Sequence, residues 1–311
     1  MYDTALCESF DGVQLNFSPT GLFILDITLC FIMFGVALDL RVGDFLRVIQ
    51  SPQKPLLGLL SQWLVLPALT FGLVWILKPC PSMALGMFLV AACPGGNISN
   101  FMASLAKGNV ALSVSLSAIS TMGAIVMTPL NFAFWASKYP PAAELLREIE
   151  LNPWDVVLKI VMILGLPLLA GMFTAHRFEA FAKKISKPIR RASIVIFGGY
   201  VVAALASNFD FFLQYVHYII LIVFVHNLIA LLSGYGIGLA AKLPEQDRRT
   251  LSIETGIQNS GLALVLIFSH IFDGLGGMAM IAAMWGIWHI LSGLTISFIW
   301  AKREPKVAET I

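Results

Sequence analysis

The chain has 311 residues, of which 58% are hydrophobic and 12% are charged. Because a soluble domain carries about a quarter charged residues, this composition excludes an ordinary soluble domain and indicates a polytopic protein embedded in a lipid bilayer. The formal net charge of +2 says little by itself, and no nucleic-acid partner is expected.

Apolar runs follow one another along almost the whole chain. A helix needs roughly 20 apolar residues to cross a bilayer. Runs of about that length lie at 20–40, 55–77, 82–106, 109–136, 154–175, 191–207, 213–241, 248–272 and 276–300. We therefore predict an all-α membrane protein with nine transmembrane helices.

The basic residues are divided unequally between the two sides that this helix count defines. Sixteen of the 20 Lys and Arg residues fall on one side and four on the other. The positive-inside rule places the richer side in the cytoplasm, so we expect the N-terminus outside and the C-terminus inside. Cys7 and Cys80 would then share the outer side, which leaves open whether they form a disulfide.

Two of the runs contain residues that interrupt a helix. The third contains Pro94-Gly95-Gly96, in which proline removes a backbone donor and glycine weakens the helix. The eighth contains a polar stretch at 252–261. Each broken run is second in a group of three, runs 2–4 and runs 7–9, and the odd offset between the groups predicts inverted repeats. Interrupted spans in corresponding halves are the best sequence pointer to the binding site of a transporter.

Oxygen-bearing side chains gather around both interruptions. Carbonyl, hydroxyl and carboxylate oxygens are the ligands that a hard cation prefers. Ser113 and Ser117 are four residues apart and lie on one face of a helix. We interpret Glu254 as a carboxylate whose charge a bound cation cancels. Two alternatives stay open: Glu254 carries a proton, or single polar residues such as Gln62 bond only a neighbouring helix.

The motifs around these residues resemble the bile acid:sodium symporter family. They are CPGGNISN at 93–100, KGNVALS at 107–113 and ETGIQNSGLA at 254–263. The resemblance implies a core domain of runs 2–4 and 7–9, in which two discontinuous helices cross, and a panel domain of runs 1, 5 and 6. The implied boundaries are an extracellular segment 1–19, panel 20–53 and 137–207, core 54–136 and 208–300, and a cytoplasmic tail 301–311.

The resemblance also implies two sodium sites, carried over position by position. The first would use the side chains of Ser99, Asn100, Ser113, Ser117 and Glu254. The second would use Gln62, Glu254 and Gln258, with backbone oxygens of Thr255 and Ile257.

The substrate would lie between core and panel, in contact with Asn97, Asn259 and His289. Ile290 stands where some bacterial members have Asn, so the identity of the substrate does not carry over. Asp26, in the first run, has no role in the family; it either reaches the outer surface or lines the cleft.

The function implied is sodium-coupled symport of an organic anion, such as a bile acid or a small carboxylate, by alternating access. Two Na⁺ ions would be co-transported, in the plasma membrane or in the inner membrane of a bacterium. The alternatives are a proton-coupled organic anion transporter and a sodium-dependent sensor on the same fold. An intramembrane enzyme is not expected, because the sequence has no paired catalytic Asp in two spans and no His-Glu-x-x-His motif.

Overall fold

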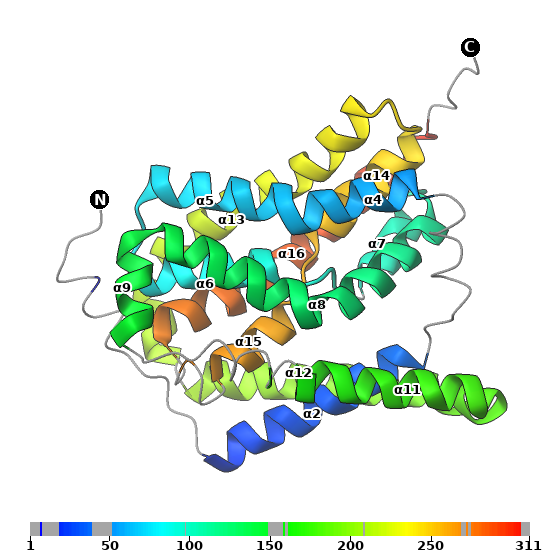
Figure 1. The fold of residues 1–311 in the computed structure, drawn as a ribbon, viewed down its shortest axis with the longest axis horizontal. Helices are drawn as coiled ribbons and strands as arrows, with labels where there is room; N and C mark the ends of the chain where they lie inside the picture. The colour runs from blue at the N-terminus through cyan, green and yellow to red at the C-terminus, as the bar shows by residue number, and fades with distance from the viewer. Residues whose placement is uncertain are drawn as a thin grey trace.

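The structure, a computed structural model, describes residues 7, 19–38, 52–96, 98–148, 158, 161–207, 209–268, 272 and 275–305. Within these ranges the regular elements are all helices and no strand is found (Figure 1). The prediction of an all-α protein is therefore confirmed for the described residues.

Helices occupy each of the predicted apolar runs. In the first half of the chain they are α2 (Pro19–Ala37), α4 (Gln53–Leu60), the π-helix η1 (Ser61–Val65), α5 (Leu66–Leu77), α6 (Pro81–Ala92), α7 (Ser99–Leu105), α8 (Val110–Lys138) and α9 (Pro140–Glu148). In the second half they are the π-helix η2 (Val161–Gly165), α11 (Leu166–Arg177), α12 (Glu179–Ser207), α13 (Phe209–Ala240), α14 (Glu245–Gly256), α15 (Ser260–Phe268) and α16 (Gly276–Ala301).

Four continuous helical segments among the described residues are long and apolar enough to cross a membrane. They are Gln53–Leu77, Val110–Lys138, Val216–Ala240 and Gly276–Ala301. These segments support a multi-pass membrane protein. The count of nine crossings stays a prediction.

Both predicted interruptions are present, and the two broken segments pair with each other. Helix α6 ends at Ala92 and helix α14 ends at Gly256, and extended backbone follows each. The Gly96 amide donates to the Ile257 carbonyl oxygen at 2.7 Å, and the Asn259 amide donates to the Pro94 carbonyl oxygen at 2.8 Å. The pairing is antiparallel. A Cβ at Gly96 would lie 3.0 Å from the Gln258 carbonyl oxygen, so the close approach of the two backbones favours glycine there.

The two broken helices are entered through the same kind of turn. Lys78 follows α5 and Lys242 lies just after α13, and both have left-handed backbone, with φ of 48° and 55°. The N-cap residues that come next, Cys80 and Pro244, have φ and ψ of −57° and 147°, and of −54° and 151°. The helices that follow, α6 and α14, both have 12 residues. This agreement supports the predicted correspondence between runs 2–4 and 7–9.

The helices that surround the crossing pack closely. Helix α6 lies against α16, α8 and α5, and it is buried on almost every side, as expected for a helix that is apolar all round. Helix α13 lies along α14, where a Cβ at Gly234 would be 2.3 Å from the Leu251 carbonyl oxygen. Helix α2 packs against α11 and α12, and Figure 1 shows this group beside the other helices.

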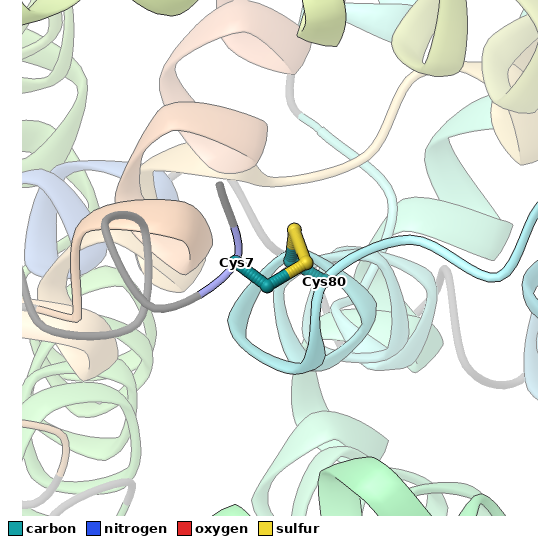
Figure 2. The surroundings of a disulfide bond; sticks show 2 residues. All are labelled: Cys7 and Cys80. Atoms are coloured by element: carbon teal, nitrogen blue, oxygen red, sulfur yellow. A yellow bond between two sulfur atoms is a disulfide. The ribbon is translucent and has the colours of Figure 1, made fainter. Parts of the chain in front are cut away.

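A disulfide joins Cys7 to Cys80, the residue that precedes α6 (Figure 2). Their Cα atoms are 5.1 Å apart, within the range that a disulfide spans. The bond ties the N-terminal segment to the start of the first broken helix. The sequence left this pairing open, because pairing depends on a distance that spacing along the chain does not reveal.

Candidate cation site at the helix crossing

A buried carboxylate lies at the centre of the crossing. Glu254, near the end of α14, is 0% exposed. Its Oε1 accepts a hydrogen bond from Ser99 Oγ at 2.6 Å and one from Ser113 Oγ, and its Oε2 accepts one from Ser117 Oγ at 3.1 Å. Among the described residues no Lys, Arg or His forms an ion pair with it. A buried ionised group is costly unless a charge or a metal compensates it, so this carboxylate requires a cation or a proton.

Around Glu254 there are more close oxygen–oxygen contacts than hydroxyl protons that could form hydrogen bonds in them. Asn100 Oδ1 lies 2.8 Å from Ser113 Oγ and 3.5 Å from Ser117 Oγ, so each hydroxyl has more than one acceptor in reach. A hydroxyl has a single proton to donate. Some neighbouring oxygens therefore face each other without a hydrogen between them, and a cation at their centre would relieve that repulsion. The structure thus brings together the five side chains that the sequence predicted for the first sodium site.

Two glutamines leave a second set of oxygens free. Gln62 Nε2 donates to the Glu254 carbonyl oxygen and Gln258 Nε2 donates to the Thr255 carbonyl oxygen, both at 2.8 Å. Because a carbonyl can only accept, these bonds fix which end of each amide is the nitrogen. The Oε1 atoms at the other ends are buried and have no hydrogen-bond partner in the described part of the chain.

The backbone oxygens predicted for the second site lie beside these amides. The Thr255 carbonyl accepts from Gln258, and the Ile257 carbonyl accepts from the Gly96 amide. A carbonyl oxygen has two lone pairs, so each can still contact a cation. The donors at the crossing are hydroxyl, amide and backbone oxygens with one carboxylate, and the described residues contain no group of three or more His, Cys, Asp or Glu that could hold a metal. This donor set suits a hard cation.

The predicted substrate contacts are less closely grouped. Asn97 and the side chain of Asp26 lie outside the described residues. Asn259 is half-buried and caps α15, since its Oδ1 accepts from the Leu262 amide at 3.0 Å. His289 is buried on α16, with Nδ1 free of any partner in the described chain. No hydrogen bond joins Asn259 to His289 among these residues.

The face of α16 that carries His289 nevertheless turns toward the second break. A Cβ at Gly286, one turn before His289, would lie 2.9 Å from Ser260 Oγ. A Cβ at Gly293, one turn after it, would lie 2.6 Å from Ile257 Cδ1. Residues three and four apart share a helix face, so His289 lies on the side of α16 that packs against this break.

Comparison with known proteins decides which class of protein carries this site. The model of the sodium bile acid symporter family matches residues 26–215. The chain belongs to this family. Over 300 residues it is 33% identical to the uncharacterized sodium-dependent transporter YocS of Bacillus subtilis (strain 168), covering 94% of this chain and 89% of the relative.

Other relatives of this chain come from plants and mammals. It is 31% identical over 305 residues to the probable chloroplastic sodium/metabolite cotransporter BASS1 of Arabidopsis thaliana, covering 97% of this chain and 71% of the relative. It is 30% identical over 255 residues to the P3 protein of Mus musculus, covering 81% of this chain and 52% of the relative. The family is one of sodium-dependent membrane transporters, so the expectations of transport and of no enzymatic activity are confirmed.

Several polar residues near the helix crossing were not singled out by the sequence as members of the site. Ser61 Oγ lies 2.7 Å from Thr255 Oγ1. Ser61 and Gln62, which both contact α14, lie in the π-helix η1, and π-helical turns are frequent at functional sites. Asn227 bonds the Gly256 carbonyl oxygen. A polar residue inside an otherwise apolar run is the signal that identifies each of them.

Proposed function

We propose that this protein is a sodium-coupled symporter that carries an organic anion across the membrane by alternating access. A bile acid or a small carboxylate is the expected class of substrate. The observation that carries the proposal is the buried carboxylate of Glu254, which three hydroxyls contact and which no cationic side chain among the described residues neutralises. The names of the relatives, sodium-dependent transporter and sodium/metabolite cotransporter, support it.

Two cation sites share Glu254 in this proposal. The first consists of Ser99, Asn100, Ser113, Ser117 and Glu254. The second consists of Gln62, Gln258, Glu254 and the backbone oxygens of Thr255 and Ile257. The crowded hydroxyls support the first site and the two free Oε1 atoms support the second. A proton on Glu254 would serve one oxygen pair only and would leave both glutamine oxygens unpaired.

The number of ions decides how strongly the substrate can be concentrated. Two Na⁺ with a monoanion move one net charge, which is worth about 2.3 kcal/mol at 100 mV. A tenfold sodium gradient adds roughly 1.4 kcal/mol for each ion. The sum of about 5 kcal/mol supports accumulation on the order of a thousandfold. One ion would make transport electroneutral and would support only about tenfold accumulation.

Alternating access requires one group of helices to move against another. We assign the panel to runs 1, 5 and 6 and the core to runs 2–4 and 7–9. The packing of α2 against α11 and α12 supports the first group, and the pairing of the two breaks supports the second. The substrate would lie between the groups, near Asn97, Asn259 and His289.

The orientation proposed places the N-terminus outside. The disulfide between Cys7 and Cys80 supports it, because disulfides persist in oxidising compartments and are rare in the cytosol. After mild reduction of intact cells, a membrane-impermeant maleimide should label Cys7. Labelling of Cys7 only after the membrane is opened would reverse the orientation.

The decisive experiment measures the melting temperature of the purified protein against sodium concentration. Potassium and choline at equal ionic strength serve as controls, and Glu254→Ala is compared with the wild-type protein. Because a ligand that binds the folded state raises its stability, we expect a rise that is specific for sodium and absent from the variant. A response to pH through Glu254, without any response to sodium, would make proton coupling the mechanism.

A further inference from the structure

The C-terminal end of α14 is held by an unusual set of side chains. The last four carbonyl groups of a helix have no partner within the helix. Here the Ile253 carbonyl accepts from the backbone of Ile257. The next three carbonyls, those of residues 254, 255 and 256, each accept from a side-chain amide, given by Gln62, Gln258 and Asn227. The half-helix therefore ends in a row of carbonyls that three amides position.

The three amides differ in what their oxygens do. The Oε1 atoms of Gln62 and Gln258 are buried without a partner in the described chain, which suits cation ligands. The Oδ1 of Asn227 instead accepts from Ser292 Oγ at 2.6 Å. Asn227 thus uses both ends of its amide for protein contacts. It touches the carbonyl row through Nδ2, while its oxygen bonds Ser292 on α16.

Asn227 connects three helices at a place where a polar group is costly. It is 1% exposed, in the middle of the apolar helix α13. It bonds Gly256 at the end of α14 through Nδ2 at 2.8 Å, and Ser292 on α16 through Oδ1. A buried amide is tolerated when its donors and acceptors are paired. The Gly256 carbonyl selects the orientation of the amide, because turning Asn227 over would set Oδ1 against that carbonyl oxygen, and Ser292 then donates to Oδ1.

We propose that Asn227 and Ser292 form a positioning pair for the second cation site. Asn227 fixes the Gly256 carbonyl, and with it the adjoining backbone of Thr255 and Ile257, while Ser292 fixes Asn227. The inference rests on the proposed function, because it assigns the pair to the second of the two sodium sites. Loss of the pair should lower the affinity for sodium more than it lowers the stability of the sodium-free protein.

The test is a sodium titration of the melting temperature at constant ionic strength, with choline as the replacement ion. The midpoint compared between variants is the apparent dissociation constant for sodium, obtained by fitting the logarithmic rise in stability with sodium concentration. Ser292→Ala should raise the sodium concentration at the midpoint by about fivefold, as expected for one lost hydrogen bond. Ser292→Thr keeps the hydroxyl and should return the midpoint to within about twofold of wild type. Asn227→Ala removes the donor itself and should raise the midpoint further than Ser292→Ala.

Ser297→Ala is the matched control. Ser297 is buried on the same helix, and its hydroxyl has no hydrogen-bond partner in the described residues. This variant should titrate like the wild-type protein. If Ser292→Ala melts earlier without sodium but keeps the wild-type midpoint, the pair is only a structural contact and the inference is overturned. If the wild-type protein does not respond to sodium, the proposed function fails first and the inference with it.

Discussion

The two broken helices have similar backbones, but their polar halves are on opposite sides of the break. In the first, α6 before the break is apolar, and α7 after it supplies Ser99 and Asn100. In the second, α14 before the break is polar, and α15 after it is apolar. Because the broken segments pair in opposite directions, the polar halves α7 and α14 pack together. Figure 1 shows these two halves toward the same end of the molecule.

The two ends of the core are consequently held together in different ways. At the polar end, buried Arg249 Nη1 donates to the carbonyl oxygens of Ala106, Trp300 and Arg303. At the apolar end, α6 and α15 belong to one large hydrophobic core. Cys80, one half of the disulfide, is part of the same core. Directional bonds therefore hold the end that bears Glu254, whereas packing holds the other. The candidate cation site lies at the polar end, where buried polar side chains can serve as ligands.

The largest effect on stability should come from replacing Arg249, the buried arginine at the polar end. Arg249→Met removes the side-chain donor of three carbonyls and one of the partners of Glu245, although the Trp300 carbonyl keeps the Arg303 amide. We expect a loss of about 3–5 kcal/mol in the free energy of unfolding, measured by denaturant unfolding in detergent. Arg248→Met is the control, because half-buried Arg248 bonds a single carbonyl, that of Leu243, and lies 3.9 Å from Glu245 in a longer ion pair. Equal losses in the two variants would contradict this account of the polar end.

The next largest effect should come from the apolar end. Cys7→Ser removes the disulfide, which joins two residues 73 positions apart in the chain. We expect a loss of about 2–4 kcal/mol of stability, and the same loss when the wild-type protein is reduced. The midpoint of the sodium titration should stay unchanged, because the bond lies at the start of α6 and the break follows the other end of that helix. A change in that midpoint would show that the two ends are not independent.

Much of this contrast could be predicted from local sequence, and the remainder depends on contacts between distant residues. Pro94, Gly95 and Gly96 predict the first break, because proline lacks a backbone donor and glycine destabilises a helix. The spacing of Ser113 and Ser117 places both on one helix face, and the structure confirms it. The motifs around these residues identified the family.

The parts that sequence reasoning missed are those that tertiary packing decides. The stretch 61–65, SQWLV, has no local feature that requires a π-helix, yet it forms one, and two of its residues, Ser61 and Gln62, contact α14. The bond between Asn227 and Ser292 joins residues 65 positions apart, and no periodic pattern encodes it. Asn259 was predicted as a substrate contact, and its helix-capping bond appears only once α15 is seen to begin at Ser260.

A smaller effect should separate ligands from neighbours on the polar side. Ser113→Ala removes a hydroxyl that contacts both Glu254 and Asn100. We expect the sodium concentration at the midpoint to rise about tenfold, with little change in the stability of the sodium-free protein. Ser115→Ala is the matched control, because Ser115, also buried on α8, bonds within the described part of the chain only the Ala111 carbonyl of its own helix. Similar shifts for both variants would remove Ser113 from the first site.

The smallest effect concerns the turn that the two ends have in common. Lys78 and Lys242 are exposed and have positive φ, which costs a residue with a Cβ more than it costs glycine. Lys78→Gly and Lys242→Gly should therefore each stabilise the protein by up to about 1 kcal/mol. Lys302→Gly provides the opposite sign, since Lys302 ends α16 with φ of −74° and glycine there gains only unfolded-state entropy. If Lys78→Gly stabilises the protein and Lys242→Gly does not, the Lys242 side chain itself stabilises the polar end. The two turns would then share their backbone conformation but not the role of their lysine.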